Sequence, residues 1–440
     1  MGHAWSFEGQ TIIAIKGSAE NVIEHCVLQP QDKKALLKEI DKLALQGLRV
    51  LAAAYKIVDQ TPRTLTNLKD LQFVSLMGFH DPPKPEAKQA VLACYKAGIA
   101  VRMITGDHPQ TALHIAEAVG IKHGNRVVNG FELEALSDQD LAKRIKDVYV
   151  FSRVIPEQKL RIVRALQASG EIVAMIGDGV NDAPSLKESD VGIAMGRQGT
   201  NVAREAADII LTDDKLVTIV NAIHDGRRIY DNIQKAVSYI FGIHIYIILT
   251  ALIIPLLGLP SLLLPIHIIL LELIIDPTCS LVFEGMPAEP DIMQRKPRDP
   301  AQPLISNTRF MRIILKSLSV FVLTAATYII SLKLGMTEEA ARTLGFSVIL
   351  WSNLFQVLSQ VSRNKITLFA LDFFKNKTFL GVYAAIFVLI ISLIYLPGLN
   401  RLFGFASVPI LLFALTILIG YMPTLGSDLY KKLPVRGVGR

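Results

Sequence analysis

Gly177-Asp178-Gly179-Val180-Asn181-Asp182-Ala183-Pro184 is the stretch that decides the fold of this chain. It follows residues 172–176 (IVAMI), an apolar run that predicts a buried strand. The two glycines permit a tight turn, and the two aspartates bring carboxylates to the end of the strand. Mg²⁺ takes oxygen ligands, usually one or two carboxylates together with phosphate oxygens. The stretch therefore indicates a magnesium and phosphate site, and the alternative is a turn with solvated carboxylates.

A second strand-like run, residues 100–104, ends at Thr105-Gly106-Asp107. A helix is expected to begin near Pro109, and its N-terminus together with the threonine hydroxyl suits an anion. By itself the tripeptide is weak support, because a turn with an aspartate cap explains most such sequences. Lys159 lies between the two runs in the sequence and is a candidate phosphate clamp. Both motifs follow strands, so we expect them at the carboxyl edge of a parallel α/β sheet.

Composition divides the chain into a soluble and a membrane half. Of its 440 residues 51% are hydrophobic and 19% charged, which is too apolar for an ordinary soluble protein. Charges are mixed through residues 1–230, whereas long uncharged runs dominate the remainder. The three cysteines form no metal or disulfide pattern, which fits a reducing cytoplasm. The net charge of +7 comes from basic residues beside apolar runs, which favours membrane topology over nucleic-acid binding.

The membrane half is expected to be all-helical, with about six crossings. No Asp, Glu, Lys or Arg occurs between Lys235 and Glu272, a gap long enough for one span and much of a second, with a turn at residues 257–261. The remaining predicted spans are centred on Val320, Val348, Phe387 and Leu415.

Loop charges predict the orientation. Basic residues gather at 295–312, at 363–377 and in the tail 431–440, all on one predicted side of the membrane. The N-terminus shows no signal peptide. We therefore expect a multi-pass protein of the cell membrane whose soluble half and both termini are cytoplasmic.

A possible ion site lies in the second predicted span. Glu272 and Asp276 stand four residues apart, hence on one helix face, in a run otherwise made of Leu and Ile. Carboxylates inside a bilayer are costly and usually serve an ion pathway, although a pair at the wet interface is the alternative. Pro277 cannot donate to the carbonyl of Leu273, which frees a possible cation ligand.

The stretch at 177–184 resembles a signature of P-type ATPases, a family within the haloacid-dehalogenase-like fold. Other motifs of the family appear in its order. Residues 16–20 (KGSAE) resemble its KGAPE motif, 47–52 (GLRVLA) its arginine-containing segment, 81–84 (DPPK) its DPPR motif, and 153–159 (RVIPEQK) the segment with its phosphate-contacting lysine. Six helices after this domain are similar to the calcium, sodium-potassium and proton pumps of the family.

The resemblance implies roles for individual residues, with ATP and Mg²⁺ as cofactors. Asp178 would bind Mg²⁺, and the nucleotide would be held by Lys16, Gly17, Arg49 and Arg153. The transferred phosphoryl group and the cradle around it would involve Thr105, Gly106, Asp107, Lys159, Asn181 and Asp182. Such catalysis is mainly positioning and charge neutralisation.

The resemblance also implies domain limits. They are the C-terminal part of a nucleotide-binding domain at 1–75, a phosphorylation domain at 76–213, a stalk at 214–236 and the transmembrane domain at 237–440. The family phosphorylates the aspartate of a DKTGT segment, which this sequence does not contain, nor does it contain the TGE loop of the actuator domain. The chain is therefore predicted to be inactive alone. A split pump completed by a separate chain, a truncated one and a fragment remain open.

In the calcium pumps the positions of Glu272 and Asp276 hold an Asn and an Asp, and the preceding helix has Asn and Glu where this chain has His244 and Ile247. His244 is thus a third candidate for the ion pathway, although a packing role is equally consistent. The identity of the transported cation stays open.

Two other classes of function remain. A membrane-tethered dehalogenase-like phosphatase needs a nucleophilic aspartate on its first strand, and residues 71–81 offer no convincing one. A non-catalytic membrane partner that binds nucleotide is compatible with the missing nucleophile. An upstream reading frame encoding DKTGT favours the split pump.

Overall fold

The computed structural model describes residues 2–7, 10–58, 68–122, 126–361 and 377–432. The chain forms two compact units, one of residues 1–223 and 293–297, the other of residues 224–292 and 298–440. Each unit is described by itself.

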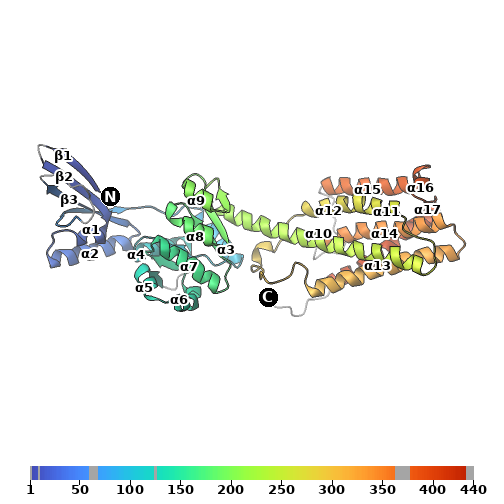
Figure 1. Ribbon diagram of the computed structural model, residues 1–440, viewed down its shortest axis with the longest axis horizontal. Helices are drawn as coiled ribbons and strands as arrows, with labels where there is room; N and C mark the ends of the chain where they lie inside the picture. The colour runs from blue at the N-terminus through green and yellow to red at the C-terminus, as the bar shows by residue number, and fades with distance from the viewer. Residues whose placement is uncertain (1, 8–9, 59–67, 123–125, 362–376, 433–440) are drawn as a thin grey trace. The chain divides into compact units, whose positions relative to one another are not determined.

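The first unit begins with a four-stranded antiparallel sheet in the order β1-β2-β3-β4. Its strands are β1 (Gly2–Phe7), β2 (Gln10–Ser18), β3 (Arg49–Val58) and β4 (Gln72–Phe79). The helices α1 (Ala19–Glu24) and α2 (Pro30–Leu45) lie against one face of this sheet (Figure 1).

The antiparallel order differs from the parallel sheet expected for the whole soluble half. Two residues separate β1 from β2, and a parallel crossover needs a dozen or more. On the helix-covered face, Ile13, Ala52 and Ala54 are buried together with Ile23 of α1. Local connection length therefore sets the strand direction here.

The expected parallel α/β architecture is confirmed in the rest of the first unit. It forms two three-stranded parallel sheets, in the orders β5-β7-β6 and β10-β9-β8. The strands are β5 (Met103–Ile104), β6 (Val127–Asn129), β7 (Val150–Ser152), β8 (Ala174–Gly177), β9 (Val191–Met195) and β10 (Ile209–Leu211). Among the described strands, β5 and β8 each pair with one neighbour and are edge strands.

Short helices connect these parallel strands and cover them. They are α3 (Ala87–Lys96), α4 (Pro109–Val119), α5 (Gly130–Ala135), α6 (Asp138–Arg144), α7 (Pro156–Ala168), α8 (Ala183–Glu188), α9 (Asn201–Ala206) and the 3₁₀ turns η1 (Ile145–Asp147) and η2 (Val180–Asp182). Helix α4 begins at Pro109 as the sequence predicts. The alternation of strand and helix places each strand's carboxyl end at a loop that can carry chemistry.

The second unit is helical. Its elements are α10 (Leu216–Leu256), α11 (Pro265–Leu270), the π-helix η3 (Leu271–Ile275), α12 (Asp276–Glu284), η4 (Ile292–Gln294), α13 (Asn307–Lys333), α14 (Glu338–Val361), α15 (Lys377–Tyr395), α16 (Leu399–Leu402) and α17 (Ile410–Lys432). Residues 214–236 were predicted to form a stalk that leads into a first span. Most of this stalk and the first span form one helix, α10, whose first residues belong to the first unit.

Helix α14 is the centre of the helical unit and packs against α12, α13, α15 and α17 (Figure 1). Its Val348, Ile349 and Val357 have no exposed surface. The hydroxyl of Tyr246 on α10 donates to the side-chain oxygen of Asn353 on α14. Polar contacts of this kind add to van der Waals packing where helices meet in an apolar setting.

Apolar length supports a membrane-type region. Within the described residues, two helices, α10 and α13, are long and apolar enough to cross a bilayer. Three apolar stretches are shorter: 265–274, 380–395 and 410–426. Helices contain all four predicted span centres, from Val320 to Leu415. Most of the predicted basic loop at 363–377 and the end of the tail lie outside the described residues.

Candidate functional site

The carboxyl end of β8 carries a short ion pair. Lys159 of α7 donates to Oδ1 of Asp182 at 2.6 Å, and the two side chains are 18% and 9% exposed. The other carboxylate oxygen of Asp182 accepts from the backbone N–H of Gly179 at 3.3 Å. Asp178 is exposed, and its carboxylate has no hydrogen-bond partner in the described part of the chain. This turn, residues 177–182, thus offers one held and one free carboxylate beside a lysine.

Glycine is required in this turn by close approach. A Cβ at Gly177 would lie 2.6 Å from Cβ of Asp182, and real Cβ atoms essentially never come so near. A side chain at 177 would therefore push Asp182 away from Lys159. The sequence argued for a tight turn, and the structure adds that the absence of a Cβ lets the strand end and Asp182 touch.

The loop after β5 is organised by its own hydrogen bonds. The hydroxyl of Thr105 donates to Oδ2 of Asp107 at 2.9 Å and accepts from its N–H at 3.1 Å. The N–H of Arg153 donates to the carbonyl of Asp107, and that of Val154 to the carbonyl of Thr105. The loop is thereby held against the residues after β7. Residues 105–107 and the β8 turn share no hydrogen bond or ion pair among the described residues.

Arg153 connects this loop to the first sheet. Its guanidinium forms an ion pair with Glu20 and a 3.3 Å hydrogen bond with the hydroxyl of Ser18. Its φ of 54° is unusual for a residue with a side chain, which indicates a backbone fixed by its surroundings. Two motifs 133 residues apart in the sequence therefore meet in the first unit.

A cavity of about 120 Å³ opens where these motifs meet. Arg49 lies on its wall, 3.4 Å from Asp107, and 66% of its side chain is exposed. The cavity is lined further by residues of the first sheet and of the loops after β5 and β7: Ser18, Glu20, Ile40, Val50, Leu51, Gly106, His108, Thr111 and Arg153. Two arginines beside a small polar cavity can neutralise an anionic group.

Two groups at this cavity have shifted pKa values. Burial by itself raises the pKa of Glu20, but hydrogen bonds, including those from Arg153 and Ser18, lower it below its ordinary value. Burial lowers the pKa of His108, although Glu20 and Asp41 face its Nε2 at 3.8 and 3.6 Å. The carboxylate is thus charged and the imidazole neutral at neutral pH.

Not every predicted residue reaches this cavity. Lys16 and Gly17 lie at the end of β2, one strand position before Ser18, and do not line it. Asn181 is exposed in the β8 turn. The structure therefore gathers Arg49, Gly106, Asp107 and Arg153 at one place, and Lys159 with the two aspartates of the β8 turn at another.

Sequence reasoning gave no role to Asp214. This residue is 4% exposed, and its carboxylate accepts from the backbone N–H groups of Gly196, Arg197 and Gln198. These bonds hold the pKa of Asp214 below its ordinary value, although burial alone raises it. Lys84 of the 81–84 motif donates to the carbonyl of Asp214 at 2.9 Å. The Asp213-Asp214 pair directly after a strand was the signal available in the sequence.

In the helical unit, His244 and Glu272 come together. Nε2 of His244 lies 3.3 Å from Oε1 of Glu272, and its Nδ1 lies 2.8 Å from the carbonyl of Ile240. Both side chains are partly exposed, at 43% and 39%. Asp276 is the first residue of α12, and its side chain lies outside the described part of the structure.

The backbone around Glu272 differs from the regular helix that the sequence predicted. Residues 271–275 form a turn of π-helix between α11 and α12. Pro277 follows it and has no N–H to donate to the carbonyl of Leu273. π-turns are rare and frequently occur at functional sites.

Two protein families match this chain. Residues 10–190 match the haloacid dehalogenase-like hydrolase model, and a second model of that name matches residues 159–223. Residues 260–433 match the model described as cation transporting ATPase, C-terminus. The two matched regions agree with the α/β part of the first unit and with the helical unit.

Curated relatives match over most of the chain. The Bacillus cereus calcium-transporting ATPase 1 is 35% identical over 94% of this chain and 50% of its own length. The Bacillus subtilis calcium-transporting ATPase is 38% identical over 82% of this chain and 41% of its own. The Synechocystis cation-transporting ATPase pma1 is 42% identical over 72% and 36%. The chain belongs to the cation-transporting P-type ATPases. It spans about half the length of these relatives, with the dehalogenase-like domain and the C-terminal membrane region of the family.

Proposed function

We propose that this chain forms the C-terminal half of an ATP-driven cation pump. The observation that carries the proposal is the β8 turn, where Lys159 holds Asp182 beside the free carboxylate of Asp178. An uncovered carboxylate next to a lysine suits Mg²⁺ and a phosphoryl group together. The loop from Thr105 to Asp107 supplies backbone and hydroxyl donors for the same chemistry.

Each residue has a distinct part in this proposal. Asp178 holds Mg²⁺, which neutralises charge on the phosphoryl oxygens when bound. Lys159 places its ammonium on the phosphoryl group, and Asp182, with Asn181 beside it, keeps that ammonium in position. Thr105 and Gly106 contact the phosphoryl oxygens.

ATP is proposed to bind at the cavity beside the first sheet. Arg49 and Arg153 face the nucleotide phosphates there, and Lys16 and Gly17 at the end of β2 reach the adenine. The pair of Arg153 with Glu20 fixes the cavity wall from both sides. The domain limits 1–75, 76–213, 214–236 and 237–440 belong to this proposal, with β4 across the first limit.

The phosphorylated aspartate must come from a DKTGT segment outside these 440 residues. The edge strands β5 and β8 support a place for it, because each pairs on one side and each ends at a site motif. Ile172 and Ile176 around β8 are 62% and 39% exposed, although strands of parallel sheets are normally covered. We propose that the DKTGT strand, in the same polypeptide or a separate one, pairs between β5 and β8.

In the membrane, six crossings and cytoplasmic termini follow from the helices α10 to α17 and from the basic loops. The protein lies in the cell membrane, and its ion pathway uses His244, Glu272 and Asp276. The relatives are named as calcium or cation transporters, so the cargo proposed here is a cation, and its identity is to be found by screening.

The test uses a completed pump, defined as this chain combined with a DKTGT-bearing N-terminal half. That half comes from a protein encoded directly upstream or from the Bacillus subtilis relative. Reconstituted in liposomes with ATP and Mg²⁺, the completed pump is expected to accumulate one of the screened cations. A preparation that forms phosphoenzyme but moves no cation contradicts the transport proposal.

One alternative function has support of its own. The missing nucleophile is compatible with a non-catalytic membrane partner that binds nucleotide. That function predicts ATP binding by the chain and no phosphorylation of any added DKTGT half.

A further inference from the structure

A second cavity, of about 250 Å³, lies at the outer edge of the β5-β7-β6 sheet. It is apart from the cavity beside the first sheet and shares no lining residue with it. Most of its wall is apolar and comes from β6, α5, α6, η1 and β7: Val128, Leu136, Leu141, Ile145, Val148 and Phe151. Such a surface gains from covering with an apolar body.

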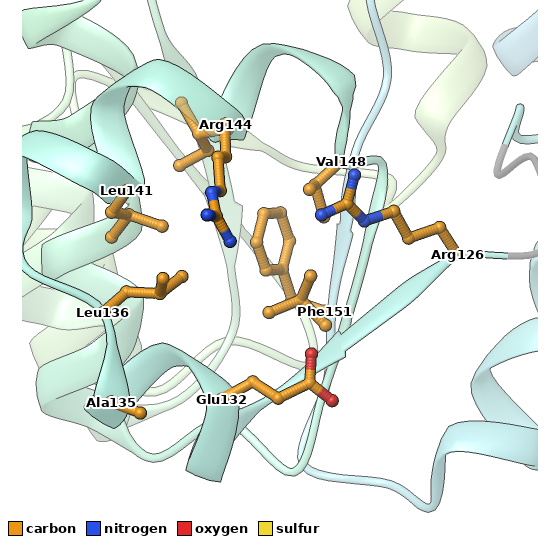
Figure 2. Close-up of a pocket in the computed structure, with 10 residues that line it drawn as sticks. Arg126, Glu132, Ala135, Leu136, Leu141, Arg144, Val148 and Phe151 are labelled. Carbon is orange, nitrogen blue, oxygen red and sulfur yellow. The ribbon is translucent and has the colours of Figure 1, made fainter.

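Two arginines converge on this cavity. Arg126 precedes β6, and Arg144 is the last residue of α6. Figure 2 shows their guanidinium groups pointing toward Phe151 from opposite sides. Neither group has a hydrogen bond or an ion pair with any described residue, and both side chains are exposed. Their donors are therefore available to a ligand in the cavity.

Neighbouring arginines of the same domain are engaged in the fold. Arg161 donates to the carbonyls of Leu133 and Leu136, and Arg164 pairs with Glu188 at 3.0 Å. By contrast, the two arginines at the cavity have no such partner among the described residues. The bonds of Arg161 also hold the end of α5, so this wall exists before any ligand arrives, which favours binding.

Charge at the cavity selects among anions. Glu132 of α5 lies at the third side, where its carboxylate accepts from the side-chain N–H of Asn129 at 2.8 Å (Figure 2). Together with two guanidinium groups it leaves a single net positive charge. A monoanion balances that charge, whereas a dianionic phosphate would face the carboxylate as well.

We propose that this cavity binds a small organic monoanion, a carboxylate on an aromatic or branched apolar body. The carboxylate lies between Arg126 and Arg144, since guanidinium groups bind carboxylates through paired hydrogen bonds. The apolar body lies against Phe151, in a space with room for one or two rings. Binding of this ligand does not depend on the proposed pump activity and is measured on the chain itself.

The test is ligand-observed NMR on the full chain in lipid nanodiscs, with indole-3-acetate as the probe. Saturable binding is expected, with a Kd on the order of 1 mM. Tryptamine has a similar ring body but carries an ammonium group, and it is expected to bind at least about tenfold more weakly. The variant R126Q/R144Q should weaken indole-3-acetate binding by about tenfold or more.

Two further variants separate the cavity from a general charge effect. Lys143→Gln removes an exposed positive charge from the same helix without touching the cavity wall, so it should leave the Kd unchanged. Ala135→Trp places a large ring at the exposed rim and should abolish binding. The proposal is overturned by binding no stronger than to empty nanodiscs, by equal affinity for tryptamine, or by an equal effect of Lys143→Gln and R126Q/R144Q.

Discussion

Two lysine–carboxylate pairs in this molecule have similar geometry and different settings. Lys159 and Asp182 lie 2.6 Å apart in the α/β part, with side chains 18% and 9% exposed. Lys235 and Glu289 lie 3.0 Å apart in the helical unit, with side chains 6% and 12% exposed. Burial and distance alone do not distinguish a chemical site from a structural tie.

The surroundings do distinguish them. Beside Asp182 lie a glycine that permits close approach and the exposed carboxylate of Asp178. Beside Lys235, Asn232 donates to the carbonyl of Met286 at 3.0 Å, so both residues fasten α10 to the segment after α12. The first pair retains groups that a ligand can use, whereas the second is consumed by packing. The predictions below test this difference.

The largest expected effect is on chemistry. Lys159→Met in the completed pump should lower the rate of ATP hydrolysis by about 10³-fold, because it removes a positive charge from the developing phosphoryl charge. Its thermal stability should change by no more than about 1 kcal/mol, since the lysine is partly solvated. Hydrolysis rates and melting curves of the same preparation check both halves of this prediction. A normal rate would mean that Lys159 is structural.

The reverse profile is expected for the other pair. Lys235→Met leaves a buried carboxylate without its partner and should lower the unfolding free energy by about 3 kcal/mol. Denaturation of the chain in detergent measures this loss. The double variant Lys235→Met/Glu289→Leu should recover most of it, because it replaces both charges by apolar groups. If the double variant is no more stable than the single one, the pair is more than a tie.

A glycine pair sharpens the comparison further. Gly177→Ala brings a Cβ to 2.6 Å from Asp182 and should cost about 1–3 kcal/mol of stability while displacing Asp182 from Lys159. Gly226→Ala is the matched control, because its Cβ meets nothing within 4 Å inside α10 and should stabilise by up to about 1 kcal/mol. Melting temperatures of both variants check the signs. A neutral Gly177→Ala would show that the turn is not tightly packed.

The smallest effect is a pH dependence at His108. Its folded pKa lies below the ordinary value of 6.5, so the fold prefers the neutral ring. The stability it contributes is complete above pH 6.5 and is lost as the pH falls through the lower folded pKa. His108→Asn retains a capping side chain at the start of α4 and should flatten this loss by less than about 1 kcal/mol. Melting curves at a series of pH values below 7 make the comparison, and identical curves would contradict it.

Local signals in the sequence predicted the site motifs well. The run before Gly177 becomes β8, and α4 begins at Pro109, because strand hydrophobicity and an N-terminal proline act over a few residues. The family resemblance supplied the order of the motifs, and the relatives bear it out.

Long-range and subtle features escaped the sequence. The bond from Arg153 to Glu20 joins residues 133 apart, and only the packing of the first unit brings them together. The π-turn at 271–275 occurs in a run of Leu and Ile that favours an ordinary helix equally well. The two unpaired arginines at the second cavity look like any solvated charges in the sequence. Six crossings and the cation remain predictions.

The central claim is that this chain supplies the lysine and magnesium carboxylate of a phosphorylation site whose nucleophile lies on another segment. The most direct measurement is incorporation of acid-stable label from γ-labelled ATP with Mg²⁺, comparing the chain alone with the completed pump. The account predicts label on the DKTGT half only when both are present, and its loss with Lys159→Met or Asp178→Asn but not with the double variant Lys235→Met/Glu289→Leu. Label that forms without this chain, or that survives Lys159→Met and Asp178→Asn, would contradict the account.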